Sequence, residues 1–418
     1  MRIALYTLGC KLNQAETDQL REGLTRKGAR IVPFGKRADC HIINACSVTE
    51  KSEKKTRQMI HRIKRKFPET HLIVTGCYTS GMQKNKHISE MVDRWVNNEK
   101  KMDIDPSPLA KSGRVDESVG PLKPGVEVEP LQQLRTRALV KIQAGCDNFC
   151  TYCIVPYLRK KIFNKPPRSI IREIKEKEKN GFKEVVLVGT NIGSYSYKLV
   201  DLLKEILAKT NIPRIRLSSL WPTAITGELL EIIKGEQRIC PHLHLSIQSG
   251  CNKILRKMGR RYTIAQCKDI ICKIRDKISM ISISADIIVG FPAESEKDFG
   301  QTYDLIKSFP FLKLHIFRFS PRYGTYAAGM PDQIPDSIKK RRAESLDALG
   351  KKQSQKVRKK YLGRILSVLF ESKKSPYWSG FSPNYLRVYV KSKRDLSNQI
   401  INVTLDQLYQ NGLKGVIT

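Results

Sequence analysis

The sequence predicts an α/β protein in three parts: a flavodoxin-like parallel sheet, a partial (β/α)6 barrel, and a small antiparallel β-barrel at the C-terminus. Three observations support this fold class. Short apolar runs alternate with helical patterns over most of the chain, and a segment rich in proline and glycine divides the alternation into two stretches. After residue 361 the pattern changes to short β runs joined by turns. The length of 418 residues is enough for two to three domains.

Residues 1–97 carry the first alternation of strand and helix patterns. Three apolar runs of strand length alternate with two polar helical patterns, in the order 3–8, 13–26, 41–44, 49–66 and 72–75. Strands that are joined through helices pair in parallel. We therefore expect a parallel sheet here, followed by a linker over residues 98–133, where prolines recur.

Residues 134–361 carry the second alternation. Six strand candidates are separated by helical patterns, at 138–142, 184–188, 214–218, 242–247, 282–289 and 313–319. Six βα units in series predict a partial barrel that is open on one side, with functional side chains at the carboxyl ends of its strands. A basic helical connector over 336–361 ends this domain.

Residues 362–418 form a separate C-terminal domain in this prediction. Four short β runs separated by turns are found there, at 364–371, 385–390, 400–405 and 416–418. Short, evenly spaced strands of this kind are typical of a small antiparallel barrel.

The charge balance indicates a polyanionic partner. The chain has 76 Lys and Arg against 40 Asp and Glu, a net charge of +36, and such a field attracts nucleic acid. A membrane surface is the competing partner, but a basic amphipathic helix with a bulky apolar face is not evident. A merely solvated basic surface is the third alternative.

No stretch approaches the roughly 20 apolar residues of a membrane helix, and the N-terminus lacks a secretory pattern, so we expect a cytoplasmic protein.

Among the eleven cysteines, three have a characteristic spacing. An odd number in a reducing compartment disfavours a disulfide framework. Cys146, Cys150 and Cys153 form a C-x3-C-x2-C pattern just after the first expected barrel strand. Fe–S clusters are usually held by four cysteines, so a set of three leaves one iron open to a substrate or cofactor. A zinc ribbon would use paired C-x2-C elements, and three loose thiols fit this spacing poorly.

These three cysteines resemble the signature of the radical-SAM superfamily. The resemblance implies a [4Fe-4S] cluster whose open iron binds S-adenosylmethionine, an external electron donor, and reductive cleavage to a 5′-deoxyadenosyl radical that abstracts hydrogen from an unreactive carbon. Cofactors of this type carry the chemistry, and the protein supplies binding and orientation. Cys146, Cys150 and Cys153 are accordingly the expected catalytic cysteines.

Longer motifs narrow the resemblance to the methylthiotransferase family. The matching segments extend over most of the chain and are TLGCKLNQAET (7–17), NAC (44–46), TGC (75–77), GCDNFCTYCIVPY (145–157), HLHLSIQSG (242–250) and DIIVGFP (286–292). Within the family, residues 8–14 and 380–390 are most similar to the branch that acts on N6-threonylcarbamoyladenosine in tRNA. That branch implies addition of a methylthio group to C2 of this nucleoside next to the anticodon, at position 37.

Cys10, Cys46 and Cys77 form a second set. Each follows one expected strand of the N-terminal sheet, and the carboxyl ends of parallel strands meet at one edge, where α/β sheets bind ligands. Buried structural thiols are a serious alternative, because cysteine is among the most buried residue types. The family resemblance implies an auxiliary [4Fe-4S] cluster that carries the sulfur to be transferred. One S-adenosylmethionine would methylate that sulfur while a second is cleaved.

The resemblance also implies contacts to S-adenosylmethionine at the carboxyl ends of three barrel strands. The expected contacts are Gly189, Thr190, Asn191, Gln248, Ser249, Gly290 and Glu294. Tight turns or local hydrogen bonds are the alternative role of these residues. The sequence departs from the family pattern at Trp221, where an acidic residue is expected, and at residues 158–167, which replace a compact Arg/Gly-rich segment.

The C-terminal segment combines basic and aromatic residues. Between residues 351 and 394 the sequence has 13 Lys or Arg and one acid, with aromatics at Tyr361, Tyr377, Trp378, Phe381, Tyr385 and Tyr389. Basic side chains contact phosphates, and aromatic ones can stack on unpaired bases. The matching family element is the TRAM domain, and the alternative is an ordinary β module with core aromatics. We expect RNA contacts at Lys391, Lys393 and Arg394.

The sequence therefore predicts a monomeric radical-SAM enzyme with two [4Fe-4S] clusters that modifies the anticodon loop of tRNA. The nearest alternative substrate is N6-isopentenyladenosine. A further family branch modifies a ribosomal-protein aspartate, but the basic C-terminal segment disfavours it. An alternative of a different class is an RNA-binding protein with a structural or redox-sensing cluster, which would form no 5′-deoxyadenosine.

Overall fold

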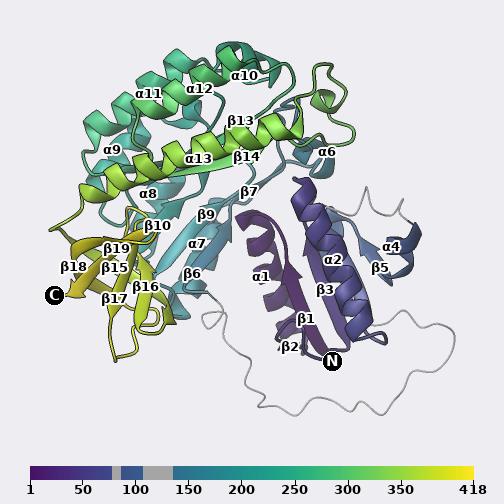
Figure 1. Cartoon of the computed structure of the whole chain (residues 1–418). Coiled ribbons are helices and arrows are strands. Elements are labelled where there is room, and N and C mark those ends of the chain that lie inside the picture. The colour runs from purple at the N-terminus through teal and green to yellow at the C-terminus, as the bar shows by residue number, and fades with distance from the viewer. Residues whose placement is uncertain (78–85, 107–134) are drawn as a thin grey trace, which may run out of the picture. The chain divides into compact units, whose positions relative to one another are not determined.

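The computed structural model describes residues 1–77, 86–106 and 135–418, and Figure 1 shows their elements coloured along the chain. Parallel strands with helices make up most of it, and a closed five-stranded barrel ends it. This mixed architecture confirms the expected α/β fold class. None of the described helices is long and apolar enough to cross a membrane.

The chain divides into two compact units. The first, here called the N-terminal unit, takes the described part of Met1–Gln133 together with Ile154–Ile162. The second, here called the barrel unit, takes all other described residues. Two features differ from the sequence prediction: residues 362–418 cluster with the barrel instead of forming a unit of their own, and Ile154–Ile162 packs with the N-terminal unit.

The N-terminal unit is built on a parallel sheet with the strand order β2-β1-β3-β4-β5. Its strands are β1 (Arg2–Thr7), β2 (Arg30–Val32), β3 (Cys40–Ala45), β4 (His71–Gly76) and β5 (Arg94–Val96). This is the order of flavodoxin-like folds, so the expected sheet is confirmed. The sequence does not predict β2 and β5, because three residues are too few to show a pattern.

Two helices cover the faces of this sheet, namely α1 (Lys11–Arg26) and α2 (Glu50–Lys66). Leu24 of α1 packs in one core with Ile42, and Ile63 of α2 packs in a second core with Ile43. Ile42 and Ile43 are neighbours on β3, and successive side chains of a strand point to opposite faces. The central strand β3 is therefore buried on both sides, as parallel sheets require.

The segment expected to be a linker begins inside the N-terminal unit. Residues 98–103 form a 3-10 helix, η1 (Asn98–Asp103), after the short helix α4 (Lys86–Glu90). Ile104 is 1% exposed and belongs to the core of the sheet, and Lys101 is equally buried. The linker prediction is thus wrong for residues 98–106, where the polar sequence shows no apolar pattern. Residues 107–133 lie outside the described part of the chain.

The barrel unit contains six parallel strand positions in series. They are β6 (Arg137–Lys141), β9 (Glu184–Val188), β10 (Arg214–Leu217) continued by β11 (Ser219–Leu220), β12 (His242–Gln248), β13 (Ser282–Val289) and β14 (Lys313–Arg318). The strands form two sheets with the orders β10-β9-β6 and β11-β12-β13-β14, which meet at the interruption between β10 and β11. The expected partial (β/α)6 barrel is confirmed.

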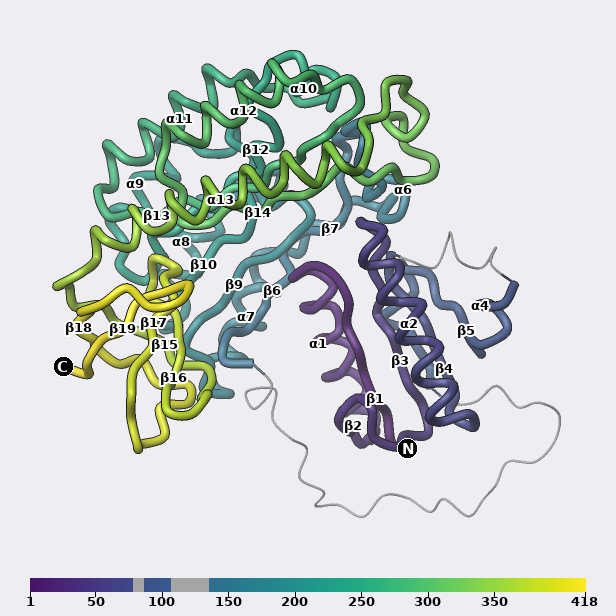
Figure 2. Tube along the Cα trace, in the orientation of Figure 1, coloured from purple at the N-terminus to yellow at the C-terminus, as the bar shows by residue number. Residues whose placement is uncertain are grey.

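Helices alternate with these strands. They are α7 (Pro167–Lys179), α8 (Leu199–Lys209), α9 (Gly227–Gly235), α10 (Asn252–Lys257), α11 (Ile264–Lys277), α12 (Glu296–Ser308) and the connector α13 (Asp336–Lys359). The connector runs along β14 and α12 (Figure 2). Thr263 and Gln266 form a capping box at the start of α11, and Ser295 and Asp298 form one at the start of α12. Local sequence therefore specifies where these two helices begin.

The C-terminal residues form a closed barrel with the order β15-β16-β17-β19-β18. Its strands are β15 (Ile365–Lys374), β16 (Tyr377–Phe381), β17 (Arg387–Lys391), β18 (Ile400–Tyr409) and β19 (Gly412–Ile417). All pairs are antiparallel except β17 with β19. The expected small antiparallel barrel is therefore present, with one parallel pair. Five strands in a closed ring cannot alternate in direction at every step, so at least one pair must be parallel.

The closed barrel packs against the amino ends of the parallel strands. Arg214 and Arg216 of β10 donate hydrogen bonds to the carbonyl oxygens of Phe381 (3.0 Å) and Ser382 (3.2 Å). Arg216 is also paired with Glu184 of β9 at 2.7 Å. In (β/α) barrels the chemistry takes place at the carboxyl ends of the strands. The C-terminal barrel therefore lies at the end of the barrel opposite to the expected active site.

Candidate functional site

Cys146, Cys150 and Cys153 lie on a loop that follows the two-residue strand β7 (Gln143–Ala144), next to the end of β6. Main-chain bonds hold the loop in place. The Thr151 N–H donates to the Met258 carbonyl (3.1 Å), and the Thr151 carbonyl accepts from the Ala327 N–H (2.8 Å). The loop is thus fixed from two sides, by segments that follow β12 and β14.

The three thiols of this loop differ in burial. Cys150 is buried, and burial raises the pKa of its thiol, while nearby Arg260 acts in the opposite direction. Cys146 and Cys153 are half-exposed. Within the described ranges no three His, Cys, Asp or Glu side chains are placed as ligands of one ion. Three cysteines on one loop are one fewer than the four that usually hold an Fe–S cluster.

Arg260 is a neighbour of the cluster loop that the sequence did not single out. Its guanidinium lies 4.2 Å from the centroid of the Trp221 ring and donates a hydrogen bond to the Tyr152 hydroxyl (2.7 Å). The residue is 8% exposed, yet its Nε and Nη1 have no hydrogen-bond partner among the described residues. Trp221, at the position expected to be acidic, thus offers Arg260 a ring face where a carboxylate would have paired with it.

The expected cofactor segment after β9 folds over β7. A side chain at Gly189 would come within 2.9 Å of the Gln143 carbonyl oxygen, and the Asn191 N–H donates to Oε1 of Gln143 at 2.9 Å. The need for glycine is therefore steric at this position. The Thr190 hydroxyl and Oδ1 of Asn191 are buried and have no hydrogen-bond partner in the described part of the chain. These two atoms remain available to a ligand.

The expected contacts after β12 are of two kinds. Gln248 has a positive φ of 71° and ends the strand. Ser249 is fully buried against Thr302, whose hydroxyl accepts the Gly250 N–H at 2.9 Å. A Cβ at Gly250 would meet the Thr302 backbone at 2.4 Å. Ser249 therefore helps to pack the turn onto α12, as the local-structure alternative predicts, whereas Gln248 has no such role.

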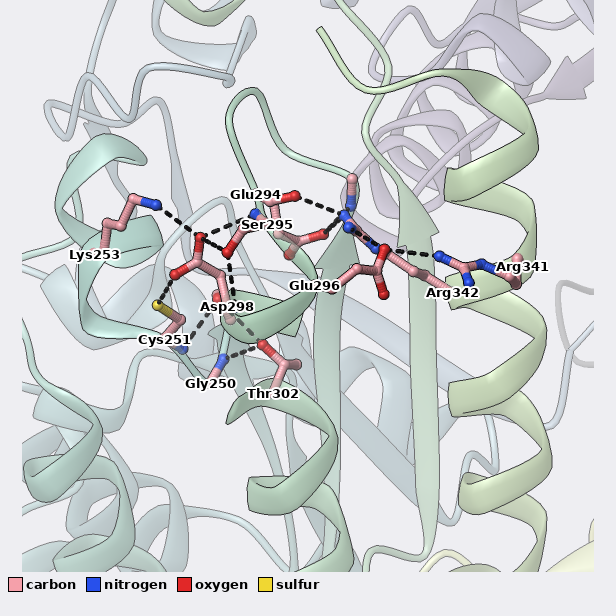
Figure 3. Close-up of polar contacts among 12 residues, drawn as sticks. Gly250, Cys251, Lys253, Glu294, Ser295, Glu296, Asp298, Thr302, Arg341 and Arg342 are labelled. Carbon is pink, nitrogen blue, oxygen red and sulfur yellow. Dashed lines mark hydrogen bonds and ion pairs between the residues drawn. The ribbon is translucent and has the colours of Figure 1, made fainter. Parts of the chain in front are cut away.

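Glu294 belongs to a buried ion pair, shown in Figure 3. Its Oε2 accepts from the Gly290 N–H (2.6 Å) and from Nη1 of Arg342 on α13 (2.7 Å). Arg342 also donates to Glu296 (2.7 Å), which the exposed Arg341 contacts too. Burial raises the pKa of Glu294. Its Oε2 therefore joins α13 to the end of β13, whereas its Oε1 is buried and has no hydrogen-bond partner among the described residues.

Cys10, Cys46 and Cys77 follow β1, β3 and β4, as expected, and the fold brings them together at one edge of the sheet. A Cβ at Gly9, where φ is +103°, would lie 2.8 Å from the Cys46 sulfur. Burial, with smaller contributions from the neighbouring thiols of Cys77 and Cys10, raises the pKa of Cys46 to about 11. The Cys77 carbonyl accepts from Ser47 at 2.6 Å. The convergence of these three thiols fits a second cluster.

A buried polar network lies next to these thiols. Glu16 on α1 accepts hydrogen bonds from Arg159 at 2.7 and 2.8 Å and from Lys101 at 2.7 Å. Asn13 also binds Arg159 (2.8 Å), and Asn44 accepts from Lys101 (3.1 Å). The two cations come from segments that the sequence described as a linker and as an unusual loop. No apolar or motif pattern could have placed them here.

The C-terminal barrel presents the expected basic residues, but most of its aromatics are structural. Lys391, Lys393 and Arg394 are exposed. Of the aromatics expected from the sequence, Tyr361, Trp378 and Phe381 are buried, and Phe370 of β15 is buried as well. A half-buried group remains at the surface, in which the rings of Tyr377 and Tyr389 both contact Tyr409 and Lys414 lies 4.3 Å from the Tyr409 ring. Both the core and the stacking alternatives are therefore represented.

Comparison with known proteins agrees with this arrangement. Residues 140–306 match the model of the radical SAM superfamily, and residues 2–97 match that of uncharacterized protein family UPF0004. The fold is similar to the radical S-adenosylmethionine methyltransferase TsrM from Kitasatospora setae, solved with cobalamin and a [4Fe-4S] cluster bound. The TM-score is 0.57 at 13% identity, over 78% of this chain and 77% of that one. The fold and the superfamily match define a radical-SAM protein.

Sequence relatives give the particular family. The chain is 32% identical to the threonylcarbamoyladenosine tRNA methylthiotransferase MtaB of Bacillus subtilis (strain 168), over 96% of this chain and 93% of the relative. It is 36% identical to the MtaB of Aquifex aeolicus (strain VF5), over 88% and 92%. It is 32% identical to the tRNA-2-methylthio-N(6)-dimethylallyladenosine synthase of Thermodesulfovibrio yellowstonii, over 99% and 98%. The chain therefore belongs to the radical-SAM methylthiotransferase family, whose cofactors include S-adenosylmethionine and a [4Fe-4S] cluster.

Proposed function

We propose that this transferase adds a methylthio group to C2 of N6-threonylcarbamoyladenosine at position 37 of tRNA, next to the anticodon. The observation that carries the proposal is the presence of two three-cysteine sites, one set in each unit, in a chain of this family. Relatives named for N6-threonylcarbamoyladenosine are 32–36% identical over 88–99% of this chain.

The residues of the barrel unit have distinct roles in this proposal. A [4Fe-4S] cluster on Cys146, Cys150 and Cys153, when bound, supplies the electron that cleaves S-adenosylmethionine at the iron without a protein ligand. The bonds of Thr151 to its two neighbours keep the loop in one geometry. Arg260 has two unpartnered N–H groups and a permanent charge, so it is suited to orient the methionyl carboxylate.

The expected cofactor contacts can now be divided. Thr190, Asn191 and Gln248 remain proposed contacts to S-adenosylmethionine. The Thr190 hydroxyl and Oδ1 of Asn191 have no hydrogen-bond partner among the described residues, and Gln248 ends β12 with a positive φ. Gly189 and Gly290 allow close packing of the turns around them. Ser249 holds its strand end in place. Glu294 does so through its Oε2, while its unpartnered Oε1 remains a proposed contact.

The RNA has to reach an active site at the carboxyl ends of the barrel strands. An adenosine presents its C2 only when it is unstacked, and a loop nucleotide pays little for this. The C-terminal barrel would hold the tRNA by phosphate contacts at Lys391, Lys393 and Arg394. The enzyme would act as a monomer and take its electron from an external donor.

Mass spectrometry of tRNA nucleosides tests the substrate. A strain that lacks the gene should lose 2-methylthio-N6-threonylcarbamoyladenosine and accumulate N6-threonylcarbamoyladenosine, and expression of the wild-type chain should reverse both changes. Four similar relatives are named for the dimethylallyladenosine product at 32% identity. If the strain instead loses the dimethylallyladenosine product, N6-isopentenyladenosine would replace N6-threonylcarbamoyladenosine as the proposed substrate.

Iron analysis tests the auxiliary cluster. Anaerobically reconstituted protein should hold about eight irons per chain, as two [4Fe-4S] clusters. Replacing Cys10, Cys46 and Cys77 together with Ala should leave about half of this iron and should leave cleavage of S-adenosylmethionine intact. Cys40→Ala is a matched control, since this thiol is buried in the same sheet outside the cysteine group. Full iron retention in the triple variant would remove the second cluster from the proposal.

A further inference from the structure

The cysteine edge of the N-terminal unit carries more buried positive than negative charge. Arg159 and Lys101 are 5% and 1% exposed, and both bind Glu16, which is 4% exposed. Two cationic side chains thus share one carboxylate. Charges buried this deeply are normally paired, because each loses several kcal/mol of hydration. Among the described residues of this edge, two cations on one carboxylate leave an excess of positive charge, which a nearby anion would offset.

The thiols of the second cysteine set are placed to supply that anion. A Cβ at Gly9 would lie 2.8 Å from the Cys46 sulfur and 3.3 Å from Nδ2 of Asn13. Oδ1 of the same Asn13 accepts a hydrogen bond from Arg159 at 2.8 Å, so a single side chain separates the guanidinium from the cysteine group. Ligation to iron requires cysteine in its thiolate form, so a cluster at this edge adds the missing negative charge.

The geometry of Arg159 is fixed by its partners. Both terminal nitrogens are used, one for Oε1 of Glu16 and the other for Oε2 of Glu16 and Oδ1 of Asn13. Asn13 is itself held by donating to the carbonyls of Leu8 (3.0 Å) and Ala45 (3.1 Å), each close to one of the cysteines. The guanidinium therefore cannot move without disturbing the strand ends that carry Cys10 and Cys46.

We propose that Arg159, with Lys101, is the built-in counter-charge of the auxiliary cluster: a positioning residue that stabilises the thiolate ligands and raises the reduction potential of the cluster. The inference rests on the proposed function in so far as Cys10, Cys46 and Cys77 hold a cluster. Because a cation favours the state with one more electron, loss of the Arg159 charge should lower the potential. Loss of the Glu16 charge should raise it.

The test uses the full-length chain with Cys146, Cys150 and Cys153 replaced by Ala, so that the auxiliary cluster is the one cluster under observation. After anaerobic reconstitution, iron content and the midpoint potential are measured, the latter by a redox titration followed by electron paramagnetic resonance. Arg159→Gln should shift the potential to more negative values and lose iron faster to a chelator. Arg159→Lys keeps the charge and should restore most of the potential.

Two further variants separate charge from packing. Lys160→Gln removes an exposed cation one residue away and should leave the potential unchanged. Glu16→Gln keeps the shape of the network and should shift the potential in the opposite direction from Arg159→Gln, which a purely structural role would not produce. If Arg159→Gln does not fold, the direction of the Glu16→Gln shift decides.

The outcomes distinguish this inference from the proposed function. If the parent variant holds no iron, the auxiliary cluster itself is refuted. If the parent holds its cluster but Arg159→Gln has the parental potential, or Glu16→Gln shifts it to more negative values, the counter-charge role is overturned while the cluster stands.

Discussion

At the scale of single residues, two neighbouring arginines on α13 show how burial decides the value of an ion pair. Arg342 and Glu294 have side chains that are 3% and 0% exposed. Arg341 and Glu296 are 65% and 60% exposed and lie at the same 2.7 Å separation (Figure 3). Removing one partner of a buried pair leaves an uncompensated charge. A pair in water loses little when it is broken.

Arg342→Met should therefore lower the free energy of unfolding by about 3–5 kcal/mol, because Glu294 would be left buried beside the end of β13. Arg341→Met should cost at most about 1 kcal/mol. Denaturant unfolding of both variants, followed by circular dichroism, measures the difference. Equal costs would show that the contact at Glu294 does not hold α13 against the barrel.

At the residue scale, the sequence revealed the proposed cluster ligands but not the residues that surround them. The spacing of Cys146, Cys150 and Cys153 is local, so it is visible in the chain. Arg342 and Glu294 are 48 positions apart, and Arg159 is 143 positions from Glu16. Pairs of this kind have no periodic pattern, so only the folded chain shows them.

At the scale of elements, main-chain hydrogen bonds to two neighbouring segments hold the loop that carries Cys146, Cys150 and Cys153. Thr151 lies between Cys150 and Cys153, and its backbone bonds reach the end of α10 and the loop after β14. A cysteine in this loop should therefore be replaceable without unfolding the barrel, since main-chain groups rather than thiols make these bonds.

Cys150→Ala should abolish formation of 5′-deoxyadenosine while the protein remains folded, because two thiolates are left to hold the cluster. Cys272→Ala is the matched control, as this thiol is exposed on α11 and far along the chain from both cysteine sets. Chromatography of the reaction products with dithionite as the electron source measures the nucleoside. Cleavage at the wild-type rate by Cys150→Ala would exclude this loop as the active site.

Element length governed what could be predicted from the sequence at this scale. Every strand of five or more residues in the three parallel sheets was expected, since each carries an apolar run. The three-residue strands β2 and β5 were not, and η1 was hidden in a polar stretch. In the closed barrel, β16 contains Ser379 and Gly380, which interrupt the alternation that marks a strand.

At the scale of the whole barrel unit, the proposed RNA grip and the chemistry lie at opposite ends. Arg214 and Arg216 bind the C-terminal barrel to the amino end of the sheet, whereas the cysteine loop is at the carboxyl end. A strand of six residues such as β14 spans about 20 Å. A substrate held at both ends must therefore be large, which agrees with a tRNA arm and makes binding separable from catalysis.

Replacing Lys391, Lys393 and Arg394 together with Ala should weaken tRNA binding to a similar extent for unrelated tRNAs, because phosphate contacts carry no sequence information. Each lost contact should make the slope of log Kd against log salt shallower by about 0.7–0.9. Replacing Arg172, Lys175 and Lys179 with Ala removes the same charge from exposed positions on α7 and serves as the control. Filter binding over a salt series measures the slopes, and activity at saturating tRNA should persist.

An unchanged slope in the first variant would place the RNA path elsewhere, with the basic end of α13 as the next candidate. A change confined to one tRNA would mean that this barrel recognises sequence, since a loss of phosphate contacts affects every tRNA alike.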